Sequence, residues 1–317
     1  MNRLAGTSRV PPESLVVMPR PRHHAAPRPI PIPRTTLVAS ALLALLVPLV
    51  AACDDGGKAS QKYAADVTEK LVPVLKEDVA QVRRGLPEGA AKLATLLEAD
   101  PGANLVALQK AIEAARASSK DLQVAKSTFF SFADPAGVVL RSEADPDMLA
   151  NKSVVAAFPE LKKALDPQVG LVEAFGEMQE MRGVRNGQDH QWVVTHPVKG
   201  GDGQLKGVFV TGWSFRAYAF RVQEAGRREL VEVAKRDQLK TAPLIYAFVF
   251  KGGKAYGEKV TPDVNSEAIE KVDLMGKTSA GAWSGTVEIT GRTFGVAAQR
   301  VPDLAPDAGV AVLVSKI

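Results

Sequence analysis

The sequence predicts an α+β protein in which a long N-terminal helical segment precedes two antiparallel sheets. Three observations lead to this prediction. Apolar residues recur at three- and four-residue steps over residues 60–120, which is the period of a helix. The period changes to two at Ser127, as in a strand. A hairpin, a helical segment and a three-strand meander then follow one another twice, which favours antiparallel sheets over a βαβ series.

The first 52 residues have the order of a secretory signal peptide. Six arginines lie in residues 1–34, an apolar run occupies residues 37–52, and small residues end that run. The run is shorter than the roughly 20 residues that a membrane-spanning helix needs, and Pro48 interrupts it. We therefore expect residues 1–52 to be removed as a signal peptide, with Met18 as an alternative start of translation.

Charge and cysteine content narrow the classes of function. The chain has 40 basic and 35 acidic residues. Residues 1–52 hold six basic residues and one acidic residue, so 34 of each kind remain after residue 52. A neutral chain gives no reason to expect nucleic acid as a partner. Cys53 is the only cysteine, so no disulfide can form within the chain. Only His190 and His196 remain after residue 52, and we expect no metal site and no cofactor.

A polar tether is expected at residues 53–59, followed by a helical segment at residues 60–125. Its apolar stripe predicts packing against a core. Gly85-Leu86-Pro87 is predicted to break the helix, because glycine and proline both disfavour a helix interior. Asp100-Pro101-Gly102 separates a further helical run from the first two.

The first, membrane-distal sheet module is expected at residues 126–216. Phe130 and Phe132 alternate before the turn Asp134-Pro135-Ala136-Gly137, which predicts a β-hairpin with Asp134 capping its own turn. Asp145-Pro146 is predicted to open a helix that ends near residue 165. The three strands that close the module are predicted at residues 171–178, 191–198 and 207–215.

A linking helix is expected at residues 217–241, with an exposed face of interleaved charges. A second, shorter sheet module is expected at residues 242–317. It repeats the order of the elements and not the residues themselves. Its predicted elements are a hairpin at 244–257, a short helix at 265–272 and strands at 285–289, 293–301 and 309–315.

Val50-Ala51-Ala52-Cys53 resembles the lipobox of bacterial lipoproteins. The resemblance implies cleavage between Ala52 and Cys53, acylation of the Cys53 thiol and anchoring in a membrane. An ordinary signal peptide, or a short transmembrane anchor with an incidental cysteine, is the alternative. Asp54 resembles an inner-membrane retention signal of enteric bacteria, although other lineages use different rules. The implied location is the bacterial envelope, facing the periplasm, on the inner membrane with the outer membrane as the alternative.

Four segments together resemble the first half of a double Cache domain, an extracytoplasmic sensor module of two PAS-like sheets behind a long helix. The segments are Phe129–Leu140, Asn151–Ser153, Trp192–Val198 and Gly207–Val210. Members of that family normally lie between two membrane spans and signal to a cytoplasmic domain. Because no second span follows here, we expect signalling through a separate envelope protein. The arginine, tryptophan and aspartate set of the amino-acid-binding members has no match in this sequence.

The resemblance implies a ligand pocket between the first sheet and the helical segment opposite it. The candidate ligand-binding residues there are Met178, Arg182, Arg185, Trp192 and His196. Methionine and tryptophan provide adaptable apolar contact, and arginine binds a carboxylate bidentately. The alternative is that Met178 and Trp192 are core residues, that both arginines lie in a solvated loop, and that His196 is a buried core histidine.

No motif for metal hydrolysis, serine catalysis or phosphate binding occurs in the sequence, so we expect no enzyme activity. The leading hypothesis is a non-enzymatic, lipid-anchored, receptor-like protein that binds a small organic ligand or a partner protein. One alternative is a structural or assembly lipoprotein of the envelope that uses the PAS-like sheets only for protein contact. The other is an unfamiliar hydrolase with an acid–base pair at His196.

Overall fold

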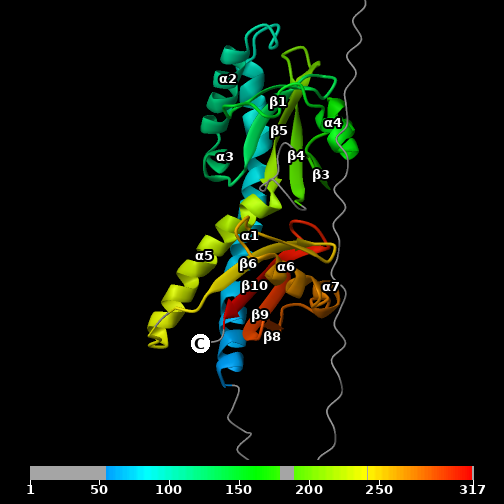
Figure 1. Cartoon of the computed structure of the whole chain (residues 1–317). Helices are drawn as coiled ribbons and strands as arrows, with labels where there is room; N and C mark the ends of the chain where they lie inside the picture. The colour runs from blue at the N-terminus through cyan, green and yellow to red at the C-terminus, as the bar shows by residue number, and fades with distance from the viewer. Residues whose placement is uncertain (1–54, 179–188, 241, 316–317) are drawn as a thin grey trace, which may run out of the picture. The chain divides into compact units, whose positions relative to one another are not determined.

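A computed structural model describes residues 55–178, 189–240 and 242–315 (Figure 1). These residues form one long helix and two five-stranded antiparallel sheets, which confirms the predicted α+β class. The strand orders are β2-β1-β5-β4-β3 and β7-β6-β10-β9-β8, so the second sheet repeats the topology of the first. The predicted repeat in the order of elements is therefore present in space as well.

Helix α1 (Asp55–Leu96) is 42 residues long and packs against both sheets. Its apolar residues recur at helical spacing and form one buried stripe. Nine residues of this stripe are at most 1% exposed: Ala64, Val67, Leu71, Leu75, Val79, Val82, Leu86, Ala90 and Leu93. The stripe supplies one wall of the core for the first sheet and for the second.

The predicted helix break at Gly85-Leu86-Pro87 is wrong, because α1 continues through Pro87. The two nearby glycines serve packing instead. A Cβ at Gly85 would lie 2.8 Å from Leu122 Cγ, and a Cβ at Gly89 would lie 2.6 Å from Leu122 Cδ1. The tertiary contacts of this stretch therefore outweigh its low helix propensity.

The first sheet lies between α1 and a short covering segment. Helices α2 (Leu105–Ser118) and α3 (Lys120–Val124) precede it and pack against α1. Asp134 Oδ1 accepts hydrogen bonds from the backbone N–H groups of Ala136 and Val138, which confirms the predicted turn cap. The strands are β1 (Phe129–Ala133), β2 (Val139–Ser142), β3 (Val172–Gly176), β4 (Gln191–Lys199) and β5 (Leu205–Ser214).

The predicted helix from Asp145-Pro146 to residue 165 is replaced by a turn and two short helical pieces, α4 (Val154–Ala157) and the 3₁₀ helix η1 (Pro159–Leu165). The carboxylate of Asp147 explains the difference. It accepts hydrogen bonds from the backbone N–H groups of Ser142, Leu149 and Ala150, so local side-chain bonding competes with the helix.

The predicted linking helix is present as α5 (Phe215–Arg236), with the Ser214 side chain accepting a hydrogen bond from Ala217 N–H at its start. It leads to the second sheet, whose outer surface is covered by α6 (Asp263–Glu270) and α7 (Leu274–Lys277). The strands of this sheet are β6 (Ile245–Lys251), β7 (Lys254–Gly257), β8 (Trp283–Ile289), β9 (Arg292–Arg300) and β10 (Ala308–Ser315).

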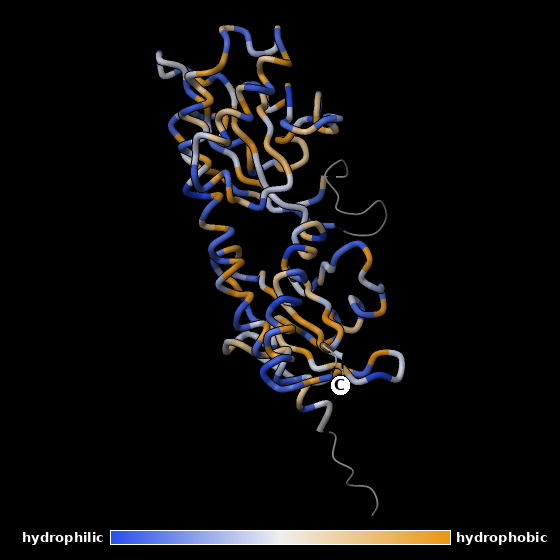
Figure 2. The backbone as a smooth tube through the Cα atoms, turned by 90° about the vertical axis from the view of Figure 1, so that its left-hand side faces the viewer, coloured by the Kyte–Doolittle hydropathy of each residue, from blue (hydrophilic) through white to orange (hydrophobic). Residues whose placement is uncertain are grey.

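Each sheet has two faces, because side chains alternate along a strand. We call the face that packs on α1 the near face and the opposite one the far face. Figure 2 shows apolar stretches along the strands and hydrophilic segments at many of the turns between them. The core is therefore in three parts: one along α1 and one on the far face of each sheet.

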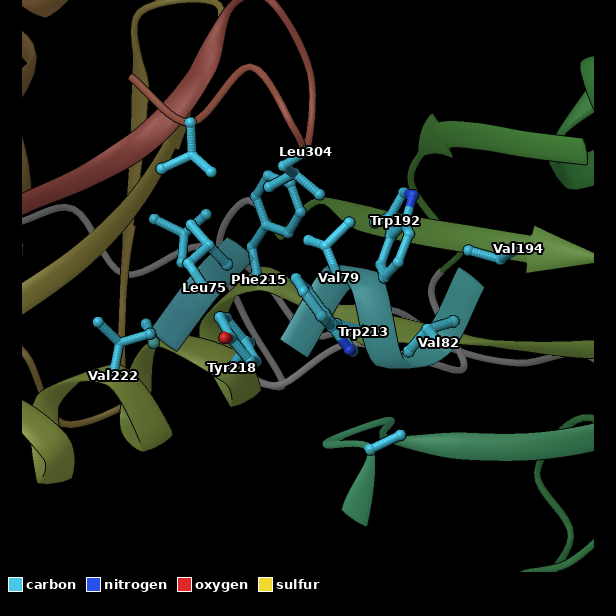
Figure 3. Packing of buried hydrophobic residues seen from close by; sticks show 14 of the residues in the cluster. Leu75, Val79, Val82, Trp192, Val194, Trp213, Phe215, Tyr218, Val222 and Leu304 are labelled. Atoms are coloured by element: carbon cyan, nitrogen blue, oxygen red, sulfur yellow. The ribbon is translucent and has the colours of Figure 1, made fainter. Parts of the chain in front are cut away.

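Side chains from α1, β5 and α5 meet in the core along α1 (Figure 3). The rings of Trp213 and Tyr218 stack with centroids 4.0 Å apart and planes 5° apart. The Tyr218 hydroxyl donates a hydrogen bond of 2.6 Å to Asp78 Oδ2, and Arg221 pairs with the same carboxylate. Burial raises the pKa of Tyr218 well above its usual value, so the phenol remains a donor. This network joins α5 to the middle of α1.

A test of the dependence on α1 is Gly295→Ala in β9. The added Cβ would lie 2.1–2.2 Å from backbone atoms of Ser60 and Gln61, so α1 must move away from the second sheet. We expect a loss of about 3 kcal/mol or more in the free energy of unfolding, measured by urea titration. Gly170→Ala is the matched control, because nothing lies within 4 Å of its added Cβ. Equal stability of the two variants would contradict the close approach.

Candidate functional site

The far face of the first sheet is built from small and polar side chains within an apolar cluster. Ser131 and Ser142 are paired across β1 and β2, and their hydroxyl oxygens lie 2.8 Å apart. The Thr195 hydroxyl donates to the carbonyl of Val172 at 3.4 Å. These buried groups satisfy one another, as buried polar groups usually do.

The far face of the second sheet carries large apolar side chains instead, with an open hollow of about 420 Å³ at its edge between α6 and β8. Five aromatic residues contribute to its cluster: Tyr246, Phe248, Phe250, Trp283 and Phe294. The two sheets thus share a topology but differ in what their far faces hold. Because aromatic side chains are large and apolar, the second far face is suited to packing. The candidate ligand site is therefore on the first sheet.

Gln191, the first residue of β4, is the polar group on the first far face whose hydrogen bonding is incomplete. It is 1% exposed, and its Nε2 donates to the carbonyl of Met178 at 2.8 Å. Its Oε1 is buried and has no hydrogen-bond partner among the described residues. A buried acceptor without a partner costs about 1–3 kcal/mol. A ligand with an N–H or O–H donor would remove that cost.

The predicted site residues are only partly brought together. Met178 lies in the far-face cluster, beside Gln191, and is 7% exposed. Arg182 and Arg185 fall outside the described residues, and so do the predicted cleavage, lipidation and sorting residues, which are Ala52, Cys53 and Asp54.

Trp192 lies on the near face, so the structure does not place it in one pocket with Met178. It is completely buried, and its indole Nε1 donates to Glu173 Oε2 at 2.7 Å. The guanidinium of Arg83 in α1 binds both oxygens of the same carboxylate, at 2.6 and 2.9 Å. Trp192 therefore helps to hold β3 and β4 against α1, which is the core role that the sequence left open.

His196 also lies on the near face, where it lines an open hollow of about 480 Å³ between α1 and the turn after β4. Its Nδ1 is 2.9 Å from the carbonyl oxygen of Pro197 and therefore donates, which leaves Nε2 as an acceptor in the neutral ring. Burial lowers the pKa of His196. The residues that line the hollow include Lys199 but no carboxylate, so the described residues do not form the acid–base pair that a hydrolase would need there.

Asp189 is a fully buried carboxylate that the sequence reasoning missed. It accepts hydrogen bonds from the Ser214 hydroxyl, at 2.5 Å, and from the backbone N–H of Arg216, at 3.1 Å. These donors lie at the start of α5, where a negative charge is favoured by the helix dipole. Its sequence signal is its place directly before β4.

A metal site and a membrane-spanning helix are both absent from the described residues. No group of three or more His, Cys, Asp or Glu side chains in residues 55–178, 189–240 and 242–315 is arranged to hold a metal ion. Within the same ranges, no helix has both the length and the apolar character needed to cross a membrane.

No protein-family model and no curated protein matches the chain. Several solved structures align with it. An extracellular ligand binding receptor from Desulfohalobium retbaense aligns with a TM-score of 0.45 and 12% identity, over 78% of this chain and 39% of that one. This chain therefore spans well under half of that receptor's length.

Two sensor proteins align over nearly their whole length. The ligand-binding domain of a Pseudomonas aeruginosa amino acid chemoreceptor, in complex with GABA, has a TM-score of 0.43 and 15% identity, over 81% of this chain and 99% of that one. The sensor domain of a Vibrio cholerae histidine kinase has a TM-score of 0.45 and 14% identity, over 82% and 97%. Each is a likeness in fold at low sequence identity.

The two histidines offer a test of the burial that surrounds them. Burial lowers the pKa of both His190 and His196, so we expect NMR titration midpoints below the usual value of about 6.5. The unfolded chain then binds these protons more tightly than the folded chain. The free energy of unfolding should therefore fall as the pH drops from about 6.5 through the folded-state pKa values. Midpoints at or above 6.5 would show that the rings are solvated.

Proposed function

We propose that the chain is a lipid-anchored, extracytoplasmic, sensor-like protein that binds a small organic ligand on the far face of its first sheet. In this proposal it is not an enzyme, and it acts through a separate envelope protein. Cys53 is the lipidated residue, Ala52 and Cys53 flank the cleavage site, and Asp54 favours the inner membrane over the outer. The proposed modules are residues 126–216 and 242–317, joined by the helix after residue 216.

The observation that carries the ligand-binding proposal is the unpaired Oε1 of Gln191. It lies next to Met178, whose flexible side chain adapts to different apolar shapes. Elsewhere the same far face keeps small and hydroxyl-bearing residues where the second sheet has aromatic ones. This combination suits a small molecule with one hydrogen-bond donor and an apolar part.

The test is thermal unfolding of the purified full chain with amino acids, carboxylates, amines and purines. A ligand that binds only the folded state raises the melting temperature by mass action, by an amount equivalent to about 2.7 kcal/mol at 100 times Kd. We expect Gln191→Met to abolish the shift, because it removes the Oε1 acceptor with little change of volume. The same variant should unfold at nearly the wild-type temperature without ligand, since it loses one hydrogen bond and one unpaired acceptor together.

His196→Ala is the matched control, because it alters the hollow on the near face and leaves the far face intact. A shift that survives Gln191→Met but disappears in His196→Ala would move the ligand site to that hollow. No shift with any compound would contradict the ligand-binding function.

A structural or assembly role is the second candidate. Helix α5 exposes Phe220 and Val231, which are 54% and 40% exposed and lie on the same side of the helix. Apolar side chains on one exposed helix face are typical of a protein-contact surface. Failure of the whole ligand panel, with a well-folded protein, would favour this role.

The lipid anchor has its own test. We expect the wild-type chain, expressed in a bacterium, to enter the membrane fraction with an acylated Cys53, and Cys53→Ser to become soluble in the periplasm. Mass spectrometry of the N-terminal peptide identifies the acyl chains. An unmodified Cys53, with cleavage at another position, would support an ordinary signal peptide.

A further inference from the structure

A second hollow lies between the N-terminal half of α1 and the second sheet. Its volume is about 230 Å³, roughly that of eight water molecules in the liquid. It is smaller and more enclosed than the hollow at His196. The residues that line it and that matter here are Asp66, Thr68, Glu69, Trp283, Ser284 and Gln299.

The charged residues that line this hollow are both acidic. Asp66 and Glu69 lie one turn apart on α1, and no lysine or arginine lines the hollow. The Asp66 carboxylate is 3.6 Å from the guanidinium of Arg236, which makes a closer pair, 2.7 Å, with Asp237. Among the described residues no cation lies within 4 Å of Glu69. The hollow is therefore matched to a positively charged occupant.

Thr68 gives a second and independent indication. It is 2% exposed, and its hydroxyl oxygen is buried without a hydrogen-bond partner among the described residues. A helical threonine commonly bonds a carbonyl one turn earlier and has two accessible side-chain rotamers. Here the carbonyl bond is not made, so the hydroxyl is available to a group in the hollow that Thr68 lines.

The remaining surface is largely apolar. Four alanines line the hollow: Ala65, Ala282, Ala297 and Ala298. The Trp283 side chain belongs to the far-face cluster, where the Lys277 ammonium lies 5.6 Å from the centroid of its ring. Next to the hollow, Gln61 of α1 donates to the Ser284 hydroxyl at 3.1 Å, which ties the helix to β8.

We infer that this hollow binds a small organic ammonium ion, such as a primary amine with a short carbon chain. The carboxylates of Asp66 and Glu69 balance its charge, the Thr68 hydroxyl accepts one of its N–H groups, and the alanines contact its carbon atoms. The site goes beyond the proposed function, because it lies on the other sheet. Its walls come from α1 and from β8 and β9, so a bound amine would tighten α1 against the second sheet.

Titration calorimetry of the full chain with propylamine and with tetramethylammonium tests this inference. We expect both cations to bind and neutral 1-propanol to give no heat of binding. Glu69→Gln should weaken both cations by about tenfold or more, because it removes a charged partner. Thr68→Val should weaken propylamine by about tenfold and leave tetramethylammonium unchanged, since the latter has no N–H group.

Two control variants test whether the loss of affinity is specific to this hollow. Glu98→Gln removes an exposed carboxylate near the other end of α1 and should leave both affinities unchanged. Gln191→Met should also leave them unchanged, so a failure of the far-face proposal does not affect this one. Circular dichroism and the melting temperature verify that each variant folds. The inference is overturned if neither cation binds, if 1-propanol binds equally well, or if Glu69→Gln has no effect.

Discussion

The buried stripe of α1 is the constraint on which the rest of the structure depends. A helix of 42 residues is roughly 60 Å long, and along that length it provides a core wall for two separate sheets. An isolated helix is marginal in water, so the stability of α1 comes from this packing. Gly89 has no side chain where Phe209 of β5 approaches α1. Gly295 has none where the backbone of α1 approaches β9. A displacement of one sheet therefore also affects the helix on which the other sheet packs.

The far faces, in contrast, are independent of α1 and have diverged in content. Aromatic side chains fill the second one, while the first keeps hydroxyl groups, small residues and the unpaired Oε1 of Gln191. The two sheets thus share one topology while their far faces differ in polarity. The proposed sensor follows from that division: a ligand on the first sheet would alter strands that also pack on α1. The contacts of Arg83 with Glu173 and with the Asp303 carbonyl connect the two modules at the middle of the helix.

Much of this architecture could be predicted from periodicity and turn chemistry. The hairpin at Asp134, the closing strands and the repeated order of elements all follow from local sequence. The continuity of α1 through Pro87 could not, because it depends on contacts of Gly85 and Gly89 with residues far along the chain. To predict that Trp192 and Met178 lie on opposite faces of the first sheet, one needs the pairing of β4 with β3 and with β5. Alternation along β4 could have shown that Gln191 and Trp192 face opposite sides, but only the fold shows which side packs on α1.

Hydrogen exchange measured by mass spectrometry tests most directly whether one helix holds both sheets. The amides of β4, β5, β9 and β10 report on the two sheets, and those of α1 report on the shared wall. If α1 is common to both cores, all of these amides should become exposed in one cooperative opening, with the same free energy under increasing denaturant. Earlier opening of one sheet, together with only the adjoining half of α1, would contradict this account and would show two modules that fold separately.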